Sequence, residues 1–213
     1  MIEILTNPDK FFEAKKGEEV SLKLPALIVL IIGIISGIGA YFMGGLTAEM
    51  LSGTLPPEAQ AFLSFISISA AITAVIGSFI IWIVFAAIFF LISCIFKGEG
   101  KFKRTLEFVG YGYIPMIISG IISAILIYNI VSTAHIPAVT DPTMIGKALE
   151  PLMKNPMMQL SYAISILFML WSANIWVFGL KHARNLSTKN ALITVAIPMA
   201  VYVLWTIFQM GVM

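Results

Sequence analysis

The sequence predicts an all-α, polytopic integral membrane protein with five transmembrane helices. Of its 213 residues, 59% are hydrophobic and only 11% are Asp, Glu, Lys or Arg, and the mean hydropathy is +0.97. A soluble domain carries about 25% charged residues, so this composition argues against a water-soluble enzyme. Five uncharged runs are each long enough to cross a bilayer core, which takes about 20 helical residues. They cover residues 24–43, 61–96, 108–130, 159–180 and 191–210.

Each run is expected to be helical, because a backbone in lipid has to satisfy its own hydrogen bonds. The runs also lack the alternation of polar and apolar residues that is typical of barrel strands. Residues 1–213 show no internal repeat and are expected to form a single membrane domain. The first run is too long for the apolar part of a signal peptide, and several acidic residues precede it.

The distribution of positive charge predicts the orientation. Lys and Arg are concentrated in the N-terminal segment and in the second and fourth loops, and only Lys147 and Lys154 lie elsewhere. The positive-inside rule then places the N-terminus inside and the C-terminus outside. The glycosylation sequon at Asn185-Leu-Ser187 falls on the predicted inner side, so we expect it to be unused.

The first element is an inner amphipathic tail over residues 1–23. Asn7 is expected to be the N-cap of a short helix, with Pro8 at its first position. Phe11 and Phe12 lie among lysines, which favours a helix on the inner membrane interface with both rings among the lipid headgroups. The alternative is an ordinary solvated helix.

The second apolar run and the loop after it are both unusual. Residues 61–96 would form a helix of about 54 Å, longer than a bilayer core, so we expect it to protrude or bend near Gly77. The following loop mixes apolar residues with Lys101, Lys103 and Arg104. This mixture is typical of an interfacial element and makes the three cations candidates for binding anionic lipid.

Three further signals mark breaks and starts. Gly110 to Pro115 interrupts helical regularity inside the third run. Asp141-Pro142 is a helix start and predicts a short amphipathic helix on the outer face. Pro198 is expected to kink the fifth helix.

Small residues and one amide stand out within the spans. Gly33, Gly37, Ala40 and Gly44 share one face of the first helix, which permits close packing within the monomer or between copies in a homo-oligomer. Asn174 is the most polar residue deep in any span. An unpaired amide in hydrocarbon is costly, so Asn174 should either hydrogen-bond to another helix or face a ligand or pore.

The chemistry-bearing residues predict no enzyme. None of the five runs contains Asp, Glu, Lys, Arg or His, and the two histidines, His135 and His182, lie on opposite predicted sides. One cysteine cannot form a metal-binding or redox pair. We therefore expect no catalytic residue, no metal and no cofactor. The basic loops carry no nucleic-acid-binding motif, and we expect no nucleic-acid partner.

Three segments resemble the Yip family, the Ypt/Rab-GTPase-interacting membrane proteins. They are Asn7-Pro-Asp-Lys-Phe-Phe12 before the first span, Phe108-Val-Gly-Tyr-Gly-Tyr-Ile-Pro115 after the basic loop, and Trp176-Val-Phe-Gly-Leu180 followed by His-Ala-Arg-Asn-Leu-Ser-Thr-Lys-Asn-Ala191. Their order and spacing, together with five spans, match the family over nearly the whole chain. The motifs add Tyr111, Trp176 and Gly179 to the candidate functional residues.

The resemblance implies a fold more firmly than a partner. Eukaryotic members of the family are implied to reside in Golgi and endoplasmic-reticulum membranes and to bind lipid-modified small GTPases. This chain has only 23 residues before its first span, so it looks like a short archaeal or bacterial member of a cytoplasmic membrane, for which such GTPases are not expected.

Two functional hypotheses follow. The first is a non-catalytic scaffold that organises membrane lipids, anionic lipids among them, or another membrane protein through its inner face. The second is a channel or carrier for a small solute or ion, with a cavity near Asn174 and the interrupted third span.

Overall fold

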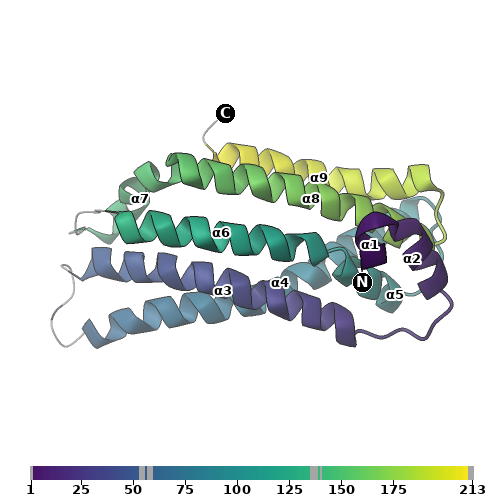
Figure 1. The fold of residues 1–213 in the computed structure, drawn as a ribbon, viewed down its shortest axis with the longest axis horizontal. Helices are drawn as coiled ribbons and strands as arrows, with labels where there is room; N and C mark the ends of the chain where they lie inside the picture. The colour runs from purple at the N-terminus through teal and green to yellow at the C-terminus, as the bar shows by residue number, and fades with distance from the viewer. Residues whose placement is uncertain (1, 53–55, 57–59, 135–138, 140, 211–213) are drawn as a thin grey trace.

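The computed structural model describes residues 2–52, 56, 60–134, 139 and 141–210, and these are mostly helical and contain no strand. Five long helices lie side by side, as predicted (Figure 1). Short helices cover one end and connect two of the long ones. The elements are α1 (Ile2–Thr6), α2 (Pro8–Lys15), α3 (Lys23–Leu51), α4 (Gln60–Ile95), α5 (Phe102–Tyr111), α6 (Ile114–Thr133), η2 (Pro142–Met144), α7 (Ile145–Met153), α8 (Pro156–Ala183) and α9 (Thr188–Gln209).

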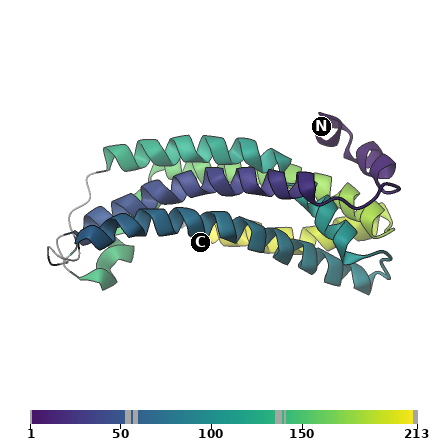
Figure 2. The same ribbon diagram turned by 90° about the horizontal axis from the view of Figure 1, so that it is seen from below.

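The long helices pack in a defined order. Helix α3 lies between α4 and α6, α6 contacts α8, and α8 contacts α9, which returns to α4. All five are long and apolar enough to cross a membrane, and most of their side chains face outward. That outward apolar surface is expected of helices surrounded by lipid, since lipid tails are as apolar as the side chains themselves. Figure 2 shows α3 and α4 as gentle arcs along the bundle.

The third span differs from its predicted bounds. It begins at Ile114 rather than at residue 108, because residues 108–111 belong to the separate helix α5. The interruption predicted between Gly110 and Pro115 is present, and it falls at Gly112 and Tyr113. Sequence hydropathy cannot separate the two helices, since the end of α5 is as apolar as the start of α6.

Three other predicted features of the helices lie at Gly77, Asp141 and Pro198. Helix α4 has 36 residues and is helical through Gly77. The carboxylate of Asp141 accepts a hydrogen bond from the Thr143 amide at 2.9 Å, at the start of η2 and α7. Helix α9 continues through Pro198.

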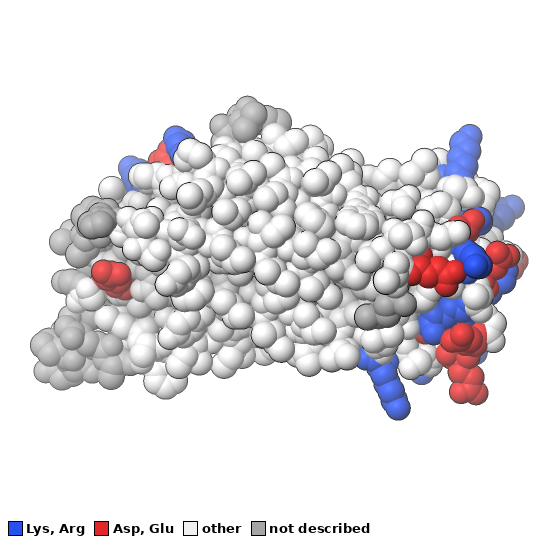
Figure 3. Space-filling model, viewed as in Figure 1, with Lys and Arg blue, Asp and Glu red and all other residues white. Residues whose placement is uncertain are grey.

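The two ends of the bundle differ in charge. We call the end that carries α1, α2, α5 and the α4–α5 and α8–α9 connections the basic end. Lysines and arginines gather there, whereas Lys147 and Lys154 lie at the opposite end with α7 (Figure 3). The main hydrophobic core also lies toward the basic end, with Phe12, Phe108 and Trp176 fully buried.

Candidate functional site

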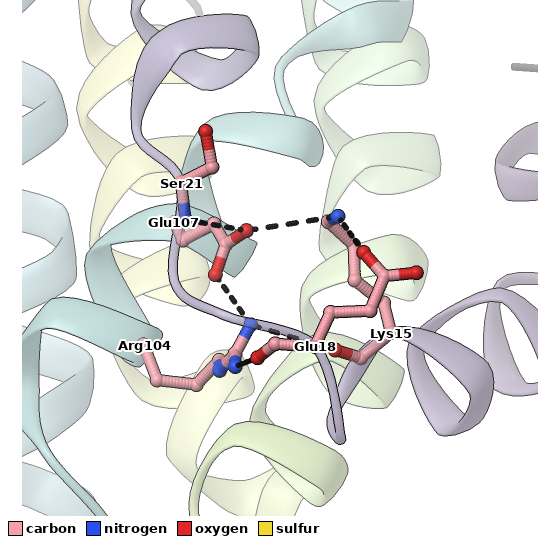
Figure 4. A network of polar contacts seen from close by, with 5 residues as sticks. All are labelled: Lys15, Glu18, Ser21, Arg104 and Glu107. Carbon is pink, nitrogen blue, oxygen red and sulfur yellow. Dashed lines mark hydrogen bonds and ion pairs between the residues drawn. The ribbon is translucent and has the colours of Figure 1, made fainter.

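A buried carboxylate organises the basic end. The side chain of Glu107 on α5 is fully buried, and Arg104 donates to it from Nη1 at 2.6 Å. The backbone amide of Ser21 donates to the same carboxylate at 3.3 Å, and the Lys15 Nζ atom lies 3.8 Å from it (Figure 4). Arg104 also donates to the carbonyls of Glu18 and Lys15. This network ties the segment between α2 and α3 to α5.

The network changes the predicted role of one cation. Arg104 is committed to Glu107 and to two backbone carbonyls, so it is not a free lipid-binding cation as predicted. Lys101 and Lys103 are exposed, as an anion-binding role requires. Sequence analysis missed Glu107; the available signal was its spacing of three residues from Arg104 on a helix, which places the two side chains together.

A second polar contact holds α2 against α8. Asp9 lies 2.6 Å from His182 Nε2 and 2.8 Å from Lys181 Nζ. Hydrogen bonds with Lys181 and then with His182 lower the pKa of Asp9 below its ordinary value of 3.8. Asn7 caps α2 as predicted, since its side chain accepts from the Lys10 amide, and Pro8 follows at the first position.

Of the two phenylalanines of α2, Phe12 does not lie among lipid headgroups, so the prediction is wrong for this ring. Phe12 is fully buried, with its ring centroid 4.6 Å from that of Phe108. Phe11 is half-buried, and its ring lies 5.4 Å from Tyr111. A Cβ at Gly179 of α8 would lie 3.4 Å from the Phe12 ring, an ordinary van der Waals distance, so the ring packs directly against this part of α8. An aromatic ring leaves water equally well for protein or lipid, and the sequence cannot distinguish the two.

Trp176 fills the break between α5 and α6. Its indole Nε1 donates to the Val109 carbonyl at 2.7 Å, and a Cβ at Gly112 would overlap the ring. This carbonyl lies at the end of α5, where it also accepts a hydrogen bond from the Gly112 amide at 3.1 Å. A Cβ at Gly110 would lie 2.6 Å from that of Pro25 on α3, so this glycine also permits a close approach. Pro115 is buried at the start of α6.

Arg184 is a buried cation that sequence analysis did not single out. It follows α8 and donates to the Ser93 hydroxyl at 2.8 Å and to the carbonyls of Gly98 and Gly100. Its guanidinium also lies 4.1 Å from the centroid of the Phe90 ring. Arg184 therefore fixes the α4–α5 connection, and Gly100 takes the positive φ of 103° that the turn requires.

The glycines of α3 lie where the sequence places them. Gly33 and Gly44 face α4 so closely that a Cβ would be 2.5 Å from the Ser78 hydroxyl or 2.9 Å from the Ser67 backbone. Gly37 faces α4 as well, with the Ala71 carbonyl 3.1 Å from such a Cβ. The half-buried Ala40 lines a groove between α3 and α6. The close contact is therefore within the monomer.

Asn174 lies outside the basic end, on the face of α8 that points outward from the bundle. It is exposed and lines an apolar groove of about 580 Å³ between α8 and α9. Its side chain forms no hydrogen bond with any residue that the structure describes. The predicted interhelical hydrogen bond is therefore not formed within this part of the monomer.

Positive side chains remain free at the basic end. Six exposed lysines there have no ion pair with another described residue, whereas Lys10 pairs with Glu3, and Lys15 with Glu18. At the opposite end Lys154 pairs with Glu150, and Lys147 forms no ion pair with a residue that the structure describes. No group of residues suited to hold a metal occurs in the described ranges. The free lysines of the basic end, which we call the lysine set, are Lys16, Lys23, Lys97, Lys101, Lys103 and Lys189.

Comparison with known proteins identifies the family. The model of the Yip1 domain matches residues 2–208, almost the whole chain. This chain belongs to the Yip1 domain family. An uncharacterized protein from the archaeon Methanocaldococcus jannaschii is 44% identical over 128 residues, which are 60% of this chain and 88% of that protein. No solved structure matches. The family membership and the five apolar helices make it an integral membrane protein, and the archaeal relative is consistent with a prokaryotic member.

Proposed function

We propose that this Yip1-domain protein is a non-catalytic membrane scaffold that gathers anionic lipids around its basic end. The observation that carries the proposal is the lysine set, whose six exposed ammonium groups lack an acidic partner among the described residues. Each Lys near an anionic membrane surface contributes about 1 kcal/mol to binding. Among the described residues of the opposite end, Lys147 alone is an exposed lysine without an ion pair, so lipid selection should be one-sided.

The buried polar groups support this role by holding the basic end rigid. Arg104 and Arg184 form hydrogen bonds within the protein, and Lys181 pairs with Asp9. These contacts join α2, α5, α8 and the α4–α5 connection into one frame that carries the free lysines. A pre-organised set of cations loses less conformational freedom on binding than cations on a mobile tail.

Lipid retention tests the proposal. The protein is reconstituted in bilayers of phosphatidylcholine with one-fifth phosphatidylglycerol and then extracted. Native mass spectrometry counts the lipids that stay bound to it. Lys101→Gln/Lys103→Gln removes two such contributions and should lower retention of the anionic lipid about thirtyfold. Lys147→Gln/Lys154→Gln at the opposite end is the matched control and should change it little. Equal losses in both double variants would contradict the proposal.

The orientation belongs to the same proposal, with the basic end inside a prokaryotic cytoplasmic membrane. In a Cys94→Ser background, Lys101→Cys should be labelled only from the inner side and Ser52→Cys only from the outer side. Labelling of both from one side would contradict both the five-span orientation and the one-sided lipid selection that depends on it.

A channel or carrier is the second candidate. Three buried hydroxyl groups, on Tyr113, Ser119 and Ser172, have no partner in the described part of the chain. Polar groups inside a membrane bundle are features of solute pathways. Flux of small polar solutes into proteoliposomes, abolished by Tyr113→Phe, would favour this candidate over the scaffold.

A further inference from the structure

The outward face of α8 carries a regular seam. Leu160, Ala163, Leu167, Leu170 and Asn174 follow one another at alternating steps of three and four residues, and all five are exposed. This is the spacing of the contact positions of a coiled coil, in which each helix presents one stripe to its partner. Within the monomer nothing described covers the stripe.

Asn174 is the polar member of this seam, and it lies at the depth of the membrane. The first charged residue of α8 is Lys181, seven residues or about 10 Å farther along the helix. Apolar side chains surround the amide in the α8–α9 groove, Leu170, Phe178 and Leu192 among them. An amide left unpaired in such surroundings is strongly unfavourable, so Asn174 needs a hydrogen-bond partner that the described part of the monomer does not supply.

We propose that the partner is Asn174 of a second copy of this chain. Copies inserted with the same topology carry this residue at the same depth, so a twofold axis along the membrane normal brings the two amides together. A carboxamide both donates and accepts, which makes the pair self-complementary. A lipid chain at this depth offers no hydrogen-bonding group.

The seam and the amide together define the dimer. Helix α8 packs parallel and in register against its copy, with Leu160, Leu167 and Asn174 one heptad apart along the contact. A single Asn at such a position in a coiled coil fixes register and oligomeric state. Side chains of the copy enter the α8–α9 groove. This interface does not include the lysine set, so the dimer can be tested independently of the proposed lipid binding.

Association in dilute lipid tests the interface. Two fluorophore-labelled populations of the full chain are mixed in phosphatidylcholine vesicles, and energy transfer is followed as the protein-to-lipid ratio falls. Asn174→Ala should weaken association about tenfold, within the range expected for an interhelical hydrogen bond. Asn129→Ala, which removes an exposed amide from α6, is the matched control and should have no effect.

Cross-linking tests the register. In a Cys94→Ser background, Leu167→Cys should form a disulfide-linked dimer on mild oxidation, and Ile121→Cys on the exposed face of α6 should not. Three outcomes would overturn the proposal: a monomer at every protein-to-lipid ratio, association that Asn174→Ala leaves unchanged, or equal cross-linking at both cysteines. A lipid retained by the wild type and lost in Asn174→Ala, without a change in association, would assign the groove to lipid instead.

Discussion

The two ends of this bundle are built differently. At the basic end, the charged groups Glu107, Arg104 and Arg184 are drawn into the protein and satisfied by one another or by backbone carbonyls. At the opposite end the Glu150–Lys154 pair stays exposed, and a small apolar cluster around Leu152 holds α7. The difference shows that a membrane bundle can bury and pair its charged groups at one end, while apolar contacts hold its other end.

The largest expected effect separates a core tryptophan from an exposed one. Trp176→Ala should lower the free energy of unfolding by about 4 kcal/mol, because it empties the space between α5 and α6 and removes the hydrogen bond from the indole to the Val109 carbonyl. Trp205→Ala, whose side chain is 61% exposed on α9, should cost much less. Unfolding in mixed micelles measures both, and similar losses would show that the basic end is not the more tightly packed region.

The next effect concerns the buried carboxylate. Arg104→Met should lower the free energy of unfolding by about 3 kcal/mol, because it leaves Glu107 buried with only the more distant Lys15 as a counter-charge. Arg104→Met/Glu107→Leu should recover most of the loss, since no unpaired charge remains. If the double variant were as unstable as the single one, the pair would matter for shape rather than for charge.

A smaller effect is expected at the opposite end. Leu152→Ala should cost about 2 kcal/mol, the low end of the range for a buried leucine, because the second cluster is small. The loss should appear as faster hydrogen exchange in α7 while exchange in α5 is unchanged. Faster exchange in α5 as well would mean that the two ends unfold together.

The smallest effect is a dependence on pH at α2. The pKa of Asp9 is lower in the folded protein than in the unfolded chain, so its contribution is complete above its ordinary value of 3.8 and is lost as the pH falls through the folded value. The protection of α2 amides, measured relative to their intrinsic exchange rate at each pH, should therefore fall on going from pH 6 to acid. Because the contact is partly exposed, the change should stay below about 1 kcal/mol.

Two variants isolate this contact. Asp9→Asn should reduce the acid effect, and the remainder should come from Glu18, whose pKa is also lowered by Lys15. Asp141→Asn at the opposite end is the control and should leave exchange in α2 unaltered. An acid response of α2 that is identical in the wild type and in Asp9→Asn would contradict the role of Asp9.

The sequence by itself determined the membrane architecture. Apolar length set five spans, because each lipid-crossing helix needs the same run of uncharged residues whatever its neighbours are. Local signals also sufficed for the Asn7 cap and for the break before Pro115, since both depend on residues adjacent in the chain. The family motifs pointed to the Yip1 domain because each motif is also a run of adjacent residues.

Only the tertiary structure decided which side chains contact other parts of the protein and which remain exposed on its surface. Phe12 and Arg104 look like membrane-facing residues in the sequence, yet one is buried against α8 and the other against Glu107. Asn174 looks like a residue of the bundle interior, yet it faces outward. Hydropathy records only whether a side chain leaves water, whereas the choice between protein and lipid is made by contacts between residues far apart in the chain.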